Sequence, residues 1–171
     1  MKTLVLSIIF SISLSQSYNK HNLKELSFAI SKTQLKDKIR KGGKDYYHAI
    51  RVKLIGIGKL NNFSNSDTLF ILETYDYESS IFYGKIWNSK NEVNYKYELG
   101  KFVFTDEKIF TKIMCKLIEN WDIKRIKKEE KENSSMIPSF IITGTRVIDK
   151  DSIRKITCIK FKEFFLLERD R

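Results

Sequence analysis

The imidazole and thiol groups that could carry acid–base or metal chemistry are few in this sequence and lie far apart. His21 and His48 are the only imidazoles, and neither begins an HxxxH or HxH pair. Cys115 and Cys158 are also widely separated, so the chain contains no local cluster with the spacing of a zinc site. We therefore expect no metal and no cofactor, and we expect His48 to be a core histidine with one hydrogen-bond partner.

Hydrolytic chemistry has weak support in the sequence. The chain has no G-x-S-x-G motif and no glycine-rich phosphate loop. His48 could act as an acid or base together with carboxylates, but any chain with this many acidic residues permits such a pairing. The carboxylates considered are Glu73, Asp76, Glu92 and Glu98. The sequence favours a protein without enzymatic activity and leaves a small extracellular hydrolase as the alternative.

Aromatic residues on three neighbouring predicted strands are the least ordinary feature. In each strand they share one parity, and they are Tyr75, Tyr77, Tyr83, Trp87, Tyr95 and Tyr97. If these parities lie on one face, the rings form a platform that binds a glycan or an extended peptide at low entropic cost. Arg51 and Lys53 would be accessory contacts. The alternative is a second core layer beneath a helix or the C-terminal hairpin, because the opposite parity is also apolar.

The two cysteines could form one disulfide if the chain is exported. On a helical wheel Cys115 points away from the apolar stripe of its helix, and Cys158 shares the parity of Lys160 and Lys162. In that arrangement both thiols point away from the layer between the helix and the sheet, and the two cysteines are then too far apart for a disulfide. The Cys115–Cys158 pairing stays open at this point.

The first residues predict a secretory signal peptide. A lysine near the start precedes an apolar and serine run over residues 4–14, and small residues follow at the positions that signal peptidase accepts. The run is about half of the roughly 20 residues that a membrane-spanning helix needs. We expect residues 1–15 to be removed before Gln16, leaving residues 16–171 as one exported domain, periplasmic or secreted, without a transmembrane anchor. The alternative is a buried first strand or helix.

The charge of the chain is strongly basic, with 32 Lys+Arg against 21 Asp+Glu and a formal net charge of +11. In an exported protein such an excess meets acidic polysaccharide, anionic lipid or a partner protein more often than nucleic acid. Lysine supplies most of it, whereas phosphate recognition favours the arginine fork. The charge alone selects none of these partners, and solubility together with coding bias is the other explanation for it. From the predicted export and the aromatic residues we expect a glycan, a peptide or an exported protein as partner, and no nucleic acid. An inhibitor or immunity-like partner of another exported protein is a further alternative.

The first part of the predicted domain contains a short helix and a strand. Residues 22–30 fit either type, and a capping box at Ser31 favours a helix over residues 32–40. From residue 46 to residue 54 apolar and polar residues alternate, which predicts a half-buried strand that carries His48. Further strands are expected over residues 68–77, 81–88 and 93–105, with a bulge or bend at Gly100.

One long amphipathic helix and a last hairpin complete the predicted domain. Apolar residues at helical spacing follow a cap at Thr105 or Asp106 and continue to Trp121. The charged run at residues 124–132 would extend this helix into solvent or fray. Two strands follow, one that begins at Pro138 and one from Ile153 to Leu167.

The fold class that follows is α+β. The predicted order is α-β-β-β-β-α-β-β, a mainly antiparallel sheet of about six strands with one long amphipathic helix packed on it.

Export can be tested on the protein taken from its own host. The expected mass spectrum shows a chain that begins at Gln16, found outside the cytosol, because signal peptidase removes residues 1–15. The same chain expressed without a secretion pathway is the control and keeps Met1. A native cytosolic protein that retains Met1 would contradict the prediction and would reopen nucleic acid as a partner.

Overall fold

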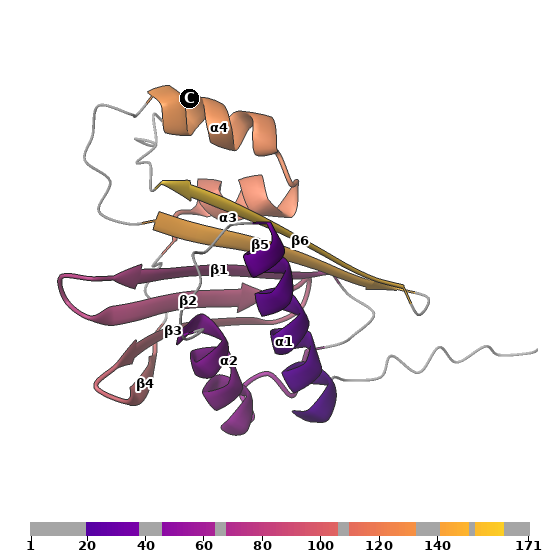
Figure 1. Cartoon of the computed structure of the whole chain (residues 1–171), viewed down its shortest axis with the longest axis vertical. Coiled ribbons are helices and arrows are strands. Elements are labelled where there is room, and N and C mark those ends of the chain that lie inside the picture. The colour runs from indigo at the N-terminus through magenta and orange to yellow at the C-terminus, as the bar shows by residue number, and fades with distance from the viewer. Residues whose placement is uncertain are drawn as a thin grey trace, which may run out of the picture.

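The computed structural model describes residues 20–37, 46–63, 68–105, 110–132, 141–150 and 153–162. It shows a mixed α+β fold in which helices pack on one antiparallel sheet (Figure 1). The elements are α1 (Lys20–Lys36), α2 (Tyr46–Gly56), β1 (Leu69–Asp76), β2 (Ile81–Trp87), β3 (Glu92–Glu98), β4 (Lys101–Phe104), α3 (Lys112–Glu119), α4 (Ile123–Glu132), β5 (Ile141–Lys150) and β6 (Ile153–Lys162). The predicted signal peptide lies outside the described residues. None of the described helices is both long and apolar enough to span a membrane.

The sheet has six strands in the order β4-β3-β2-β1-β5-β6, and all the pairs are antiparallel. Strands β1 to β4 follow one another as hairpins because their connections are short. Strand β5 returns to the other side of β1 and pairs with β6. The predicted fold class and the number of strands are therefore confirmed, although the elements that supply them differ in part.

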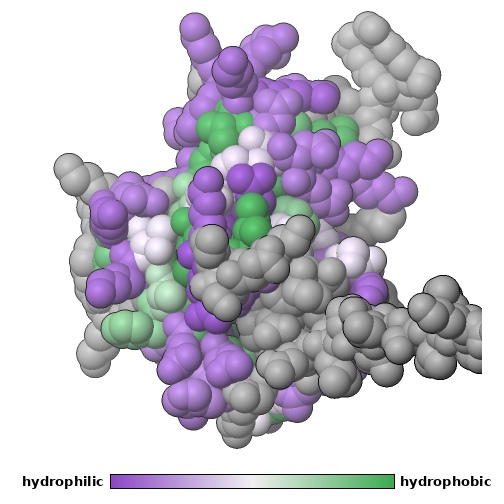
Figure 2. Space-filling view, turned by 90° about the vertical axis from the view of Figure 1, so that its right-hand side faces the viewer, coloured by the Kyte–Doolittle hydropathy of each residue, from purple (hydrophilic) through white to green (hydrophobic). Residues whose placement is uncertain are grey.

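Two core layers separate the helices from the sheet. Helices α1 and α2 bury Leu26, Ile30 and Leu54 against one sheet face, and helices α3 and α4 bury Ile118 and Ile126 against the other. On the side shown in Figure 2, hydrophilic residues surround smaller hydrophobic areas. Both faces of the sheet are thus covered by helices, which agrees with the prediction that residues on both sides of the central strands are apolar.

The strand expected from residue 46 to residue 54 is helix α2, so that prediction was wrong. Its buried residues are Ile50, Arg51, Leu54 and Ile55, which repeat at helical spacing. Alternation over this short segment could not distinguish a strand from a helix. The helix expected over residues 32–40 also begins earlier, because α1 runs without a break from residue 20. Ser31 does not cap it, and its hydroxyl accepts a hydrogen bond from Arg51 instead.

The predicted strand over residues 93–105 is the hairpin of β3 and β4. Leu99 and Gly100 have φ angles of 47° and 81°, so both central residues of this two-residue turn are left-handed, as a type I′ turn requires. Gly100 therefore reverses the chain and does not mark a bulge or bend within one strand.

The expected long helix is two helices. Thr111 caps α3, since its Oγ1 accepts the N–H of Met114 at 3.2 Å. At the other end Trp121 has a φ of 52°, and the N–H groups of Trp121 and Asp122 bond to Ile118 and Leu117 in a Schellman arrangement. The chain then turns into α4.

The charged run at residues 124–132 is a separate helix, α4, whose outer side is exposed to solvent and whose inner side packs on the fold. Ile126 is buried on its inner side. Lys127 Nζ donates to the carbonyl oxygen of Lys160 at 3.1 Å, and Glu130 Oε1 accepts the N–H of Lys162 at 3.1 Å. Helix α4 thus lies along the outer side of β6. The predicted ends of the last two strands, at Pro138 and Leu167, lie outside the described residues.

Gly84 in β2 makes room for a buried tyrosine. It pairs with Tyr95 of β3, and a Cβ atom on Gly84 would overlap Cζ and Oη of that ring. Tyr95 is 0% exposed and stacks on Phe82, with 6.1 Å between ring centroids. The missing side chain of Gly84 thus lets a large ring lie flat across the sheet.

We expect Gly84→Ala to lower the free energy of unfolding by about 1–3 kcal/mol, because the added methyl group overpacks the Tyr95 ring. Gly56→Ala is the matched control, since a Cβ there meets nothing within 4 Å. It should leave stability unchanged or raise it by up to about 1 kcal/mol. Urea denaturation measures both, and equal stabilities for the two variants would contradict this account of Gly84.

Candidate functional site

The six rings predicted to form one platform are divided between the two sheet faces. Tyr75, Tyr95 and Tyr97 lie on the α2 face, whereas Tyr83 and Trp87 belong to the core under α3. The register pairs Tyr75 with Phe82, and Phe82 with Tyr97, so Tyr83 points to the opposite side. Trp87, Tyr95 and Tyr97 are also buried. The prediction that all six rings form one exposed platform is therefore wrong, because the register of the hairpins places Tyr83 and Trp87 of β2 on the opposite face of the sheet.

A different set of rings lines the α2 face toward the edge of the sheet. We call it the aromatic shoulder, and it consists of Tyr46, Tyr75, Tyr97, Phe102 and Phe104. Ring centroids are 5.3 Å apart for Tyr46 and Tyr75, 4.8 Å for Tyr97 and Phe102, and 6.1 Å for Phe102 and Phe104. Tyr46 and Phe104 are 42% and 38% exposed. The shoulder is thus a supported row of rings with accessible ends.

Tyr77 extends this row beyond the end of β1. It is 83% exposed, and its ring meets that of Tyr75 edge to face at 4.9 Å. Three of the six predicted rings, Tyr75, Tyr77 and Tyr97, therefore remain at or next to the shoulder. Tyr46, Phe102 and Phe104 were missed because the segment of Tyr46 was predicted as a strand and β4 was not separated from β3.

Two lysines of the α2 segment reach the shoulder. Lys53 Nζ donates to Tyr97 Oη at 2.5 Å, and Lys59 Nζ lies 4.8 Å from the ring centroid of Phe104. Burial raises the pKa of Tyr46, as do the neighbouring Tyr75 and Tyr97, and Lys53 opposes them. Tyr46 therefore keeps its hydroxyl proton at neutral pH.

Strand β4 is the outer strand next to the shoulder, and no other described strand pairs with its outer side. Thr105 N–H donates to the carbonyl of Asn94, and pairing continues with Val103 opposite Lys96 and Lys101 opposite Glu98. Backbone groups alternate in direction along an antiparallel strand, so those of Phe102 and Phe104 point outward. They form an edge that another strand can join.

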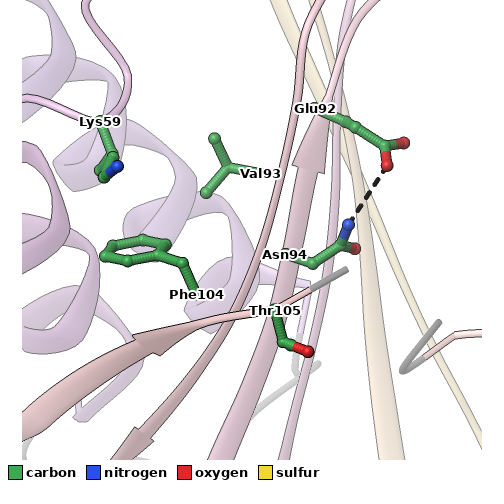
Figure 3. A pocket seen from close by; sticks show the side chains of 6 residues that line it. All are labelled: Lys59, Glu92, Val93, Asn94, Phe104 and Thr105. Atoms are coloured by element: carbon green, nitrogen blue, oxygen red, sulfur yellow. Dashed lines mark hydrogen bonds between the residues drawn. The ribbon is translucent and has the colours of Figure 1, made fainter. Parts of the chain in front are cut away.

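A hollow of about 240 Å³ opens where β3 and β4 meet the end of α2. It is lined by Lys59, Glu92, Val93, Asn94, Phe104 and Thr105 (Figure 3). Val93, Phe104 and Lys59 lie on the α2 side of β3, whereas the side chains of Glu92 and Asn94 lie on its other side, because side chains alternate along a strand (Figure 3). There Asn94 Nδ2 donates to Glu92 Oε1 at 3.3 Å, and the buried Oδ1 of Asn94 has no hydrogen-bond partner among the described residues. On the α2 side the hollow is therefore an apolar wall beside one lysine.

Beneath α1 and α2 lies a buried polar cluster. Arg51 Nη1 donates to Glu73 Oε2 at 2.7 Å, and its other nitrogens donate to Ser27 and Ser31. Arg51 is 2% exposed, so the expectation that it is an accessory contact at the surface is wrong. Lys53, the other residue named for that role, does reach the ring surface.

The hydrolase alternative depends on His48, and the structure places this residue beside the buried cluster. Its Nδ1 lies 3.0 Å from Ser27 Oγ, and its ring packs on Phe28. Ser27 and Glu73 are 2% and 0% exposed, which leaves a substrate no access to either. The geometry of the described residues therefore does not assemble a hydrolytic cleft around His48.

Two of the other carboxylates considered, Asp76 and Glu92, have structural contacts of their own. Asp76 accepts hydrogen bonds from Ser79 and from the N–H of Glu78 in the β1–β2 turn, and the Ser79 bond lowers its pKa. Glu92 pairs with Lys85 Nζ at 2.8 Å, which lowers its pKa. No group of three or more His, Cys, Asp or Glu among the described residues could hold a metal ion.

The two cysteines are free thiols on opposite faces of the sheet. Cys115 is buried in the core under α3, so the prediction that it faces away from the sheet was wrong. The helix is shorter than expected, and its buried stripe includes the next residue after Met114. Cys158 lies on the α1 side, where its Sγ is 3.5 Å from Thr145 Oγ1.

Burial raises the pKa of both thiols to about 11. Between pH 9 and pH 11 the unfolded chain loses these protons before the folded chain does, so stability should fall as the pH rises. We expect a loss of the order of 1–3 kcal/mol per thiol. Urea denaturation at pH 9 and pH 11 measures it, with Cys115→Ala/Cys158→Ala as the control for tyrosine and lysine titration. The same pH dependence in both proteins would contradict the assignment.

No protein-family model, curated protein or solved structure matches this chain. The aromatic shoulder, the open edge and the hollow are the features of the described residues that bear on function.

Proposed function

We propose that this protein is a non-enzymatic binding protein that holds an extended peptide along the outer edge of β4. The observation that carries the proposal is the adjacency of three features at the outer end of β4: outward backbone groups, the partly exposed ring of Phe104 and a hollow with an apolar wall. Phe104 belongs to all three, because its backbone points outward, its ring ends the shoulder and its side chain lines the hollow.

The open edge favours a peptide over a glycan. Only a peptide supplies alternating N–H and C=O groups that match those of Phe102 and Phe104. Strand addition uses main-chain hydrogen bonds for affinity and leaves specificity to the side-chain pockets beside the edge. Phe102 and Phe104, the shoulder rings on β4 itself, would pack beside every second side chain of the bound strand, because side chains alternate between the faces of a sheet.

The hollow narrows the choice of peptide. Its volume of about 240 Å³ is below the roughly 300–1,000 Å³ of a typical small-molecule site, so it suits one side chain. Val93 and Phe104 offer apolar contact on the α2 side, whereas the side chains of Glu92 and Asn94 lie on the other side of β3 (Figure 3). The side chain that fits beside Val93 and Phe104 is therefore an apolar one.

The proposal places this binding outside the cytosol. The support is the sequence of residues 1–15, which has the charge and apolar run of a cleaved signal peptide. The peptide would then be an extended segment of another exported protein, which is also how an inhibitor or immunity-like partner would dock.

An array of short immobilised peptides, with an oligosaccharide array beside it, tests the ligand class. Phe104→Ala and Phe104→Pro are the matched variants, since both remove the ring and only proline also removes the outward N–H. We expect peptides to bind, and we expect Phe104→Pro to bind roughly fivefold more weakly than Phe104→Ala, because it loses one hydrogen bond of about 1 kcal/mol. Fluorescence polarisation with the selected peptide measures the difference.

Circular dichroism of both variants checks that β4 still folds. Binding to oligosaccharides alone, or equal peptide affinities for the folded alanine and proline variants, would contradict strand addition at this edge.

A further inference from the structure

Arg146 of β5 differs from the other described arginines, because it makes no ion pair with a carboxylate of the described residues. Arg51 pairs with Glu73, Arg125 with Glu129 and Arg154 with Asp149. The Nε atom of Arg146 is buried without a hydrogen-bond partner. Arg146 as a whole is only partly exposed, and burial lowers the pKa of its guanidinium group. A charged group is thus partly removed from water, and no anion among the described residues compensates it.

The side chain of Arg146 is held against an aromatic wall. Its Cζ lies 4.7 Å from the ring centroid of Trp121, and Phe70 is its partner across the β1–β5 ladder. Phe70 in turn stacks on Trp87, with 5.4 Å between centroids and 29° between planes. The rings orient the guanidinium group without using its N–H donors, since a stacked arginine keeps its fork free.

The position of Trp121 is imposed by backbone geometry that its residue type does not favour. It occupies the left-handed residue after α3, with a φ of 52°, where glycine is the usual choice. A side chain with a Cβ is strained there. The tryptophan therefore gives up local backbone stability to place its ring under Arg146.

The carboxylates closest to this wall in the chain have other partners. Glu119 Oε1 accepts the indole N–H of Trp87 at 2.8 Å. Asp122 Oδ1 accepts the N–H of Arg125 and so caps α4. Neither makes an ion pair with Arg146, so the terminal Nη1 and Nη2 donors of the guanidinium are not occupied by these carboxylates and can serve a ligand.

We propose that Arg146, stacked on Trp121, is an oxyanion-binding site on the face of the sheet opposite the aromatic shoulder. The planar fork of arginine matches the two oxygens of a carboxylate or a phosphate and binds either through two parallel hydrogen bonds. This site is independent of the peptide edge at β4, because it uses a different face of the sheet and none of the same residues.

Intrinsic fluorescence reports on this site directly, since Trp87 and Trp121 are the only two tryptophans of the chain. The probes are sodium phosphate and sodium acetate, with sodium chloride at matched ionic strength as the reference. We expect a saturable change in emission with phosphate or acetate and none with chloride. The two titrations also distinguish a phosphate site from a carboxylate site.

Arg146→Gln should abolish the saturable change, and Arg125→Gln is the matched control because Arg125 lies on α4 against Glu129. Arg146→Lys keeps the charge without the fork, so it should weaken binding at least fivefold while preserving the fold. The proposal is overturned if the unmodified protein shows no saturable response. It is overturned as well if the glutamine variant responds like the control, or, where that variant does not fold, if the lysine variant binds with unchanged affinity.

Discussion

The buried ion pair between Arg51 and Glu73 fixes the relative position of three elements on which the rest of the fold depends. Both side chains are removed from water, at 3% and 0% exposure, and the contact is 2.7 Å. Desolvation of two charges is offset only when the remaining donors are also satisfied. Ser27 and Ser31 of α1 supply those acceptors. Removal of one partner from such a pair costs about 3–5 kcal/mol, so α1, α2 and β1 are held in one arrangement.

This arrangement decides what stays uncovered on the α2 face. Arg51 anchors the middle of α2 over β1, and Lys53, on another side of the same helix, reaches Tyr97 of β3. Helix α2 therefore covers the centre of the sheet and leaves Phe104 of β4 partly exposed. The shoulder and the hollow are consequences of where a buried charge pair places one helix.

The sequence predicted correctly those strands whose alternation and bounding turns can be recognised from neighbouring residues alone. The strands expected over residues 68–77 and 81–88 are β1 and β2 within two residues at each end, because period-two alternation ends at polar turns there. Helix α2 was not predicted from the sequence, because a charged residue, Arg51, occupies one of its buried positions. A buried charge at that position is stable only beside the opposite charge of Glu73, and local sequence does not show a contact between residues so far apart in the chain.

The candidate site was only partly foreseen, for a similar reason. Parity within a strand is local, but the face that a parity occupies depends on register between strands. Tyr97 and Lys53 were among the residues named from the sequence, whereas Phe102 and Phe104 were hidden in a strand that is really a hairpin. Asn94 and Lys59 come from separate segments, and nothing in their spacing indicated a shared hollow.

The two edges of the sheet are treated differently by this chain. At the β6 edge, Lys127 and Glu130 of α4 bond to backbone groups of the strand, which occupies groups that another chain could use. Strand β4 has no described cover of this kind, yet it has only four residues, and a short edge limits uncontrolled pairing. An edge kept short, lined with rings and placed beside a hollow offers a selective surface for one strand. The contrast between the two edges therefore supports a binding role for β4.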